Sequence, residues 1–183
     1  MGYSHYFYKK ELKHSNVSWN AFLKDVKKVA CRFKLAIPKS VAFITDKEEL
    51  IKGDIDIKIG DGMGEGLPPE FDEEHIWFNG VGDDSHETLH ICKDDTEKLE
   101  GSMSDYYKDM WRCDKHIFGF TKTNRKPYDL LVTATLVLYK HHFKDKVEIR
   151  SDDGFDGFKE GLELVNSTLG YKIVKEDIYN PEE

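Results

Sequence analysis

The sequence predicts an α+β protein with one domain, residues 1–183, in which a mixed β-sheet is packed by about three helices. Three observations support this fold class. The chain starts with alternating aromatic and polar residues, a long apolar helix follows a proline in the second half, and other short segments alternate as strands do. A chain of 183 residues is long enough to bury a core within a single domain.

The first part of the chain predicts strands around one helix. Residues 3–8, "YSHYFY", alternate and are aromatic, which is typical of a strand. Ser18 can cap the helix that follows, in which apolar residues recur at helical spacing. Pro38 opens a predicted strand, "SVAFIT", and Asp46 starts a short predicted helix. A further alternating strand is expected at residues 55–59.

The middle of the chain predicts a hairpin between two irregular segments. Residues 60–75 have no apolar period and are expected to form a loop. The runs "IWFNG" and "TLHIC" are expected to pair as an antiparallel hairpin. Residues 94–115 are acidic and irregular, so we expect a long surface excursion with one helical turn.

The C-terminal part has the most regular pattern and predicts a β-α-β-α unit. Residues 116–121 read as a strand, and Pro127 suits the first turn of a helix that runs to Phe143. Residues 147–151 form the next predicted strand. A last amphipathic helix is expected to end at Gly170.

Composition and charge narrow the choice of partners. The net charge of −8 disfavours long nucleic-acid duplexes and anionic membranes, although a local basic patch can still bind a small anion. No apolar run approaches the roughly 18 residues that span a bilayer. The three cysteines are widely spaced and predict reduced thiols. We therefore expect a cytoplasmic protein that has no membrane partner.

The β-α-β pattern predicts where a ligand binds. If its two strands are parallel, the crossover is right-handed, and the loops after both strands emerge at the same edge of the sheet. One loop is basic and the other is acidic, so charges of opposite sign would face one crevice. The predicted ligand-binding residues are Thr121, Lys122, Thr123, Arg125, Lys126, Tyr128, Asp152 and Asp153.

The expected ligand is a phosphorylated small molecule, with a nucleotide as the leading example. The start of a helix presents free N–H groups and the positive end of its dipole, which attract anions. Arg125 could bind a phosphate with two parallel hydrogen bonds. Asp152 and Asp153 could orient sugar hydroxyls or hold a divalent metal ion. The alternative is that the basic side chains are solvated and pair with these aspartates.

The run "HETLH" at residues 86–90 matches a zinc-hydrolase motif by its letters. That motif needs His86 and His90 one turn apart on a helix, with Glu87 as general base. The run is short and strand-like, which argues against the required helix. His86 and Glu87 are also the candidate acid–base residues of the predicted phosphate site. A third alternative is a non-catalytic interaction protein that masks a host protein with its acidic surface.

Several motifs together resemble a family of uncharacterised proteins from bacteria and their phages. These motifs are "MGYSHYFY", "HET", "FTKTNRKPYD" with "YKHHF", and "SDDG", and they span most of the chain. Members usually have threonine where Ser4 stands. The resemblance names no chemistry, but it implies that "HET" accompanies the basic loop in a shared pocket.

Overall fold

The computed structural model describes residues 2–36, 53–100 and 104–179. Its strands are β1 (Ser4–Lys9), β2 (Phe33–Leu35), β3 (Ile55–Gly60), β4 (Glu70–Phe71), β5 (His75–Gly80), β6 (Leu89–Cys92), β7 (Ile117–Lys122) and β8 (Val147–Ser151). Its α-helices are α1 (Asn16–Ala30), α3 (Ser104–Asp114), α4 (Asp129–Phe143), α5 (Lys159–Leu169) and α6 (Lys175–Ile178). The predicted α+β class is confirmed.

The strands form two sheets where the sequence predicted one. In the first sheet β1 lies between β7 and β8 and is antiparallel to both. The second sheet has the order β2-β3-β5-β4, with β6 also paired to β5. Only β2 and β3 form a parallel pair among the described strands, so the architecture is mixed. The sheets meet where the Glu87 N–H donates to the carbonyl of Lys122 and the Thr121 hydroxyl donates to the carbonyl of Thr88.

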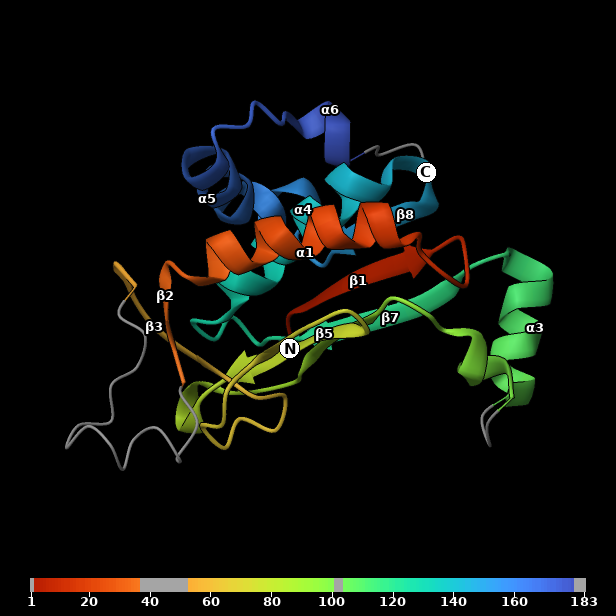
Figure 1. Ribbon diagram of the computed structural model, residues 1–183, viewed down its shortest axis with the longest axis horizontal. Coiled ribbons are helices and arrows are strands. Elements are labelled where there is room, and N and C mark those ends of the chain that lie inside the picture. Colours follow the sequence, from red (N-terminus) through yellow and green to blue (C-terminus); the bar gives the residue numbers. More distant parts are fainter. Residues whose placement is uncertain (1, 37–52, 101–103, 180–183) are drawn as a thin grey trace.

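The helices α1, α4, α5 and α6 lie together on one side of the strands (Figure 1). The helix α4 is apolar on all sides and is buried along nearly its whole length, because α1, α5, α6 and β8 surround it. The helix α3 lies apart from this layer, at the right-hand end of the view, and it contacts β7 (Figure 1). No helix in the described ranges is long and apolar enough to cross a membrane.

The two helices that flank the predicted site approach each other closely. Gly161 of α5 faces the backbone of α4, and a Cβ atom at this position would lie 2.5 Å from the Ala134 nitrogen. Only glycine permits this close approach without a shift of one helix. The start of α5 is therefore held against the first half of α4.

Two local expectations need correction, and a third is not tested. The cap of α1 is Ser15, whose side chain accepts from the N–H of Ser18, so Ser18 lies inside the first turn. The excursion at 94–115 contains the helix α3. The acidic composition of the segment obscured the amphipathic spacing of this helix. The predicted strand and short helix that follow Pro38 lie outside the described residues.

A buried lysine joins the two sheets. Lys9, at the end of β1, is 1% exposed, and its ammonium donates to the carbonyls of Leu12, Cys92 and Lys93. It also forms an ion pair with the buried Asp95, with a distance of 2.8 Å between the Nζ and Oδ2 atoms. Burial lowers the pKa of Lys9, and the charge of Asp95 opposes this shift. A buried charge with four acceptors fixes the end of β1 against the β6 side.

We expect Lys9→Met to destabilise the protein by about 3–5 kcal/mol, because it leaves three carbonyls without their donor and leaves Asp95 with Lys98 as its one remaining cation among the described residues. Lys10→Met is the matched control, since Lys10 is the exposed neighbour and its pair with Glu148 is long at 3.8 Å. Chemical denaturation would measure both variants. Equal losses for the two variants would contradict the assigned role of Lys9.

His14 is a buried histidine in an aromatic cluster. It is 1% exposed, and its ring nitrogens hydrogen-bond to the Tyr139 hydroxyl at 2.6 Å and to Glu11 at 2.7 Å. Its ring lies 3.9 Å from that of Phe143, measured between centroids. Burial lowers the pKa of His14 from 6.5 to about 4. The folded state therefore resists a proton that the unfolded chain accepts.

This shift predicts a loss of stability on acidification. The contribution of His14 is complete above pH 6.5 and is lost as the pH falls towards 4, by roughly 3 kcal/mol. His14→Gln should remove this part of the pH dependence, whereas His86→Gln, at an exposed position, should retain it. Urea denaturation at several pH values would compare the slopes. Parallel curves for the wild type and His14→Gln would contradict the prediction.

Candidate functional site

The basic and acidic loops meet at one edge of the first sheet, as the sequence predicted. The guanidinium of Arg125 forms an ion pair with Asp153, with 2.7 Å between Nη2 and Oδ2. It also stacks over the ring of Tyr3 at 3.9 Å from the centroid. The strands that carry the loops are parallel but are not neighbours, because β1 lies between them. The start of β1 therefore lies between the two loops.

The loop that carries Arg125 has a strained backbone. Asn124 and Arg125 both have positive φ angles, 51° and 57°. The Lys126 N–H donates to the carbonyl of Thr123, so residues 123–126 have the features of a type I′ turn. Glycine and asparagine suit such positions, but arginine does not, and the cost for a non-glycine residue is of the order of 1 kcal/mol or more. This turn places the Arg125 side chain over Tyr3.

The start of α4 does not present the free N–H groups that the sequence analysis expected. The N–H groups of Asp129 and Leu130 donate to the carbonyls of Lys126 and Pro127. A short turn before the helix thus provides their acceptors. The carboxylate of Asp129 also occupies the first turn, where it complements the helix dipole. The first N–H groups of α4 are therefore not the donors expected for an anion at this edge, and the side chains are the better candidates.

Asp129 forms a pair with a buried histidine. The Oδ1 atom of Asp129 lies 2.7 Å from Nε2 of His5, which is fully buried on β1. Nδ1 of His5 has no hydrogen-bond partner among the described residues. The ring therefore makes one hydrogen bond, and a proton on Nε2 that is donated to Asp129 accounts for it. The sequence pattern marked neither His5 nor Asp129 as a candidate residue, because their meeting depends on tertiary structure.

Several predicted ligand-binding residues are used within the fold. Asp152 accepts from the N–H of Ser4 and from the hydroxyl of Tyr6, both at 2.8 Å, so its carboxylate fixes the start of β1. Lys126 donates from its ammonium to the carbonyl of Asp83. Among the predicted cations, Arg125 is therefore the one held between the two loops.

The remaining predicted residues differ in how they are engaged. Tyr128 is buried and donates to the carbonyl of Glu87, and burial raises its pKa. Thr121 bonds between the sheets, as described above. Thr123 is fully buried, and its hydroxyl has no partner among the described residues. The ammonium of Lys122 also has no partner in the described ranges.

The "HET" segment contacts the basic strand, but it does not form a zinc-binding helix. The run of residues 86–90 passes from a loop into β6, so His86 and His90 do not share a helical face. The Oε2 atom of Glu87 accepts a hydrogen bond from the Lys122 N–H at 3.0 Å. The carboxylate that was proposed as the general base is therefore already hydrogen-bonded. Asn79 holds the backbone of His86 from both sides, while the His86 side chain is exposed. The segment therefore joins the two sheets.

A cleft of about 650 Å³ opens beside the Arg125–Asp153 pair. We call it the α4–α5 cleft, and its walls come from the 125–133 and 153–163 segments together with Tyr3 and Ile57. Its basic residues are Arg125, Lys126 and Lys159, and its acidic residues are Asp129, Asp153, Asp156, Glu160 and Glu163. Carboxylates thus outnumber cations, and the cleft as a whole is acidic.

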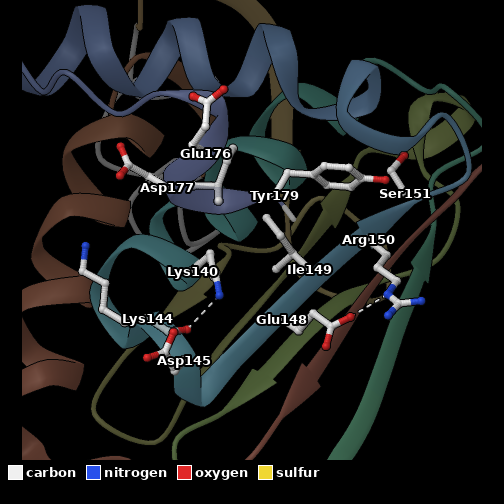
Figure 2. A pocket seen from close by; sticks show the side chains of 11 residues that line it. Lys140, Lys144, Asp145, Glu148, Ile149, Arg150, Ser151, Glu176, Asp177 and Tyr179 are labelled. Carbon is white, nitrogen blue, oxygen red and sulfur yellow. Dashed lines mark hydrogen bonds and ion pairs between the residues drawn. The ribbon is translucent and has the colours of Figure 1, made fainter. Parts of the chain in front are cut away.

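A second cavity, of about 300 Å³, lies between β8, the end of α4 and α6 (Figure 2). Two of its cationic side chains bond to groups of the cavity wall. Lys140 donates to the carbonyl of Lys144, and Arg150 donates to the carboxylate of Glu148 (Figure 2). None of the predicted ligand-binding residues with a charged side chain lines this cavity. The α4–α5 cleft is therefore the stronger candidate.

Comparison of the chain with family models, with curated proteins and with solved structures gives no match. Any functional assignment therefore depends on the geometry of the site alone.

The position of Glu87 predicts a structural role for its carboxylate. Glu87→Ala should cost about 1–2 kcal/mol, because the Lys122 N–H loses its acceptor. Glu87→Gln should be close to wild type, since an amide oxygen can accept the same bond. Denaturant unfolding would measure both, with His86→Ala as a neighbouring exposed control. Wild-type stability of Glu87→Ala would contradict this role.

Proposed function

We propose that the α4–α5 cleft binds a phosphorylated small molecule, with a magnesium-bound nucleotide as the best example. The observation that carries this proposal is the placement of Arg125. Its guanidinium stands at the mouth of the cleft, stacked on Tyr3 and paired with Asp153. A planar guanidinium next to an aromatic ring is suited to a phosphate group and an adjacent planar ring.

The ion pair of Arg125 is compatible with exchange for a ligand. The Arg125 side chain is 63% exposed and that of Asp153 is 42% exposed. Exposed ion pairs contribute roughly 0–1 kcal/mol, so a phosphate can replace the carboxylate at low cost. Asp153 would then be free to accept hydrogen bonds from sugar hydroxyls.

The excess of carboxylates in the cleft favours a ligand that carries its own divalent cation. Asp156 pairs with Lys159 at 2.8 Å, whereas Glu160 and Glu163 on α5 have no cation partner among the described residues. No three carboxylate or imidazole atoms in the described part of the cleft converge closely enough to form a ready metal site. A cation bound to the phosphate would offset the repulsion between the ligand and these carboxylates.

For any reaction in this cleft, we assign Asp129 and His5 as the acid–base candidates in place of His86 and Glu87. Asp129 lines the cleft, and the buried His5 orients its carboxylate. A histidine–carboxylate pair is a common arrangement for proton transfer. His86 does not line this cleft.

The charge balance favours a second candidate function, binding of a cationic small molecule. Five acidic side chains line the cleft against three basic ones, and Tyr3 offers an aromatic surface. A polyamine would pair with the carboxylates directly and would need no metal. The two candidates predict opposite effects for substitutions at Arg125, because Arg125 attracts a phosphate and repels a cation.

Calorimetric titration of the full chain with nucleotides, with and without Mg²⁺, would test the leading proposal. We expect binding to require Mg²⁺, and we expect Arg125→Ala to weaken it about tenfold, the effect of losing one charged hydrogen bond. Arg112→Ala is the matched control, because Arg112 is an exposed arginine on α3 whose one ion pair within the described residues is with Asp109. It should leave binding unchanged.

Two outcomes would contradict the phosphate proposal. One is the absence of heat of binding or thermal stabilisation with any phosphorylated ligand at about 1 mM. The other is binding of spermidine that becomes tighter in Arg125→Ala, which would support the cationic ligand instead.

A further inference from the structure

We propose that the exposed face of the β4-β5-β6 sheet binds a divalent transition-metal ion, with Zn²⁺ as the best match. The ligands are His75, Glu70 and Asp72, and His90 supplies a fourth donor. We call this set the β5 metal site. It lies outside the α4–α5 cleft and does not depend on the proposed function of that cleft.

Three ligand atoms of this set already converge. Nε2 of His75 lies 2.8 Å from Oε2 of Glu70 and 3.6 Å from Oδ2 of Asp72. The three atoms all lie within 4.8 Å of one another, and no other such group occurs in the described ranges. Zinc bonds to nitrogen and oxygen measure about 2.0–2.2 Å, which places neighbouring donors of a tetrahedral ion roughly 3.4 Å apart. The observed separations lie on both sides of that value.

Strand register brings the donors to one face. His75 pairs with Cys92, Trp77 pairs with both His90 and Glu70, and alternate residues of a strand share a face. The other face of the hairpin carries Ile76 and Ile91, which are buried in the core. His75 and His90 are therefore fixed to the outer face by the burial of their apolar neighbours, and strand pairing places Glu70 on the same face.

The backbone also holds one carboxylate in place. Oδ1 of Asp72 accepts the N–H groups of Glu74 and His75, at 2.8 Å and 2.9 Å. This leaves Oδ2 directed at His75. Hydrogen bonds that orient a ligating carboxylate are a common feature of metal sites.

A cavity of about 490 Å³ adjoins the set and is lined by the proposed fourth donor, His90, which lies outside the three converged ligand atoms. His75 and His90 both line it, with 5.5 Å between their ring centroids. Cys92 lies beside them, with its sulfur 3.3 Å from Nε2 of His90. Two imidazoles with two carboxylates favour zinc over magnesium, which prefers an octahedral set of oxygen ligands. Under this proposal, the second histidine of the "HETLH" run binds the metal together with His75 and not with His86.

Titration of the metal-free full chain with Zn²⁺, Co²⁺ and Mg²⁺ tests the site. We expect one equivalent of Zn²⁺ to bind and to raise the unfolding temperature, and Mg²⁺ to do neither. Co²⁺ should give the intense visible absorption of a tetrahedral ion. His75→Ala should weaken zinc binding about tenfold or more, and His75→Gln repeats the test with a side chain of similar length.

The matched controls are His86→Ala and Cys92→Ser. His86 belongs to the same motif but lies outside the β5 metal site, so its loss should leave zinc affinity unchanged. Cys92→Ser should also retain binding. Unchanged affinity in both His75 variants, or no binding by the wild type, would overturn the proposal. Loss of binding in Cys92→Ser with retention in His75→Ala would also overturn it, because the ligands would then be His90 and Cys92.

Discussion

The pairing of β1 between β7 and β8 is the constraint on which the rest of the molecule depends. Because β1 is antiparallel to both neighbours, β7 and β8 point the same way and end at the same edge. The start of β1 lies at that edge, so its first residues contact both loops. The other end of β1 is fixed by the buried Lys9 and its four acceptors. One strand therefore links the candidate cleft to the junction between the two sheets.

The C-terminal unit was predictable because its signals are local. Pro127 precedes a long apolar run that predicts a buried helix, and Gly170 adopts the left-handed conformation that ends α5. The meeting of Arg125 with Asp153 followed from the β-α-β pattern, and the inserted β1 preserved it. Insertion of a distant strand changes which strands are neighbours but does not change the direction in which they run.

The remainder of the candidate site depends on contacts that no local pattern encodes. The His5–Asp129 pair joins residues 124 positions apart. The first N–H groups of α4 donate to carbonyls of the preceding turn, so they are not free to bind a ligand. The letters of "HETLH" matched a helical motif, yet Leu89 and Ile91 alternate into the core, and burial of that face selects a strand. The pairing of His75 with Cys92 became visible only with the strand register.

The two candidate sites differ in what fixes their side chains. At the β5 metal site the two histidines are held by a hairpin whose opposite face is buried, so their positions follow from core packing. At the α4–α5 cleft, Arg125 is held by a strained turn and by two exposed contacts, and each exposed contact is weak. The strain of the turn is present with or without a ligand, whereas the contacts can be exchanged. The β5 metal site is therefore suited to retaining an ion, and the α4–α5 cleft is suited to exchanging one partner for another.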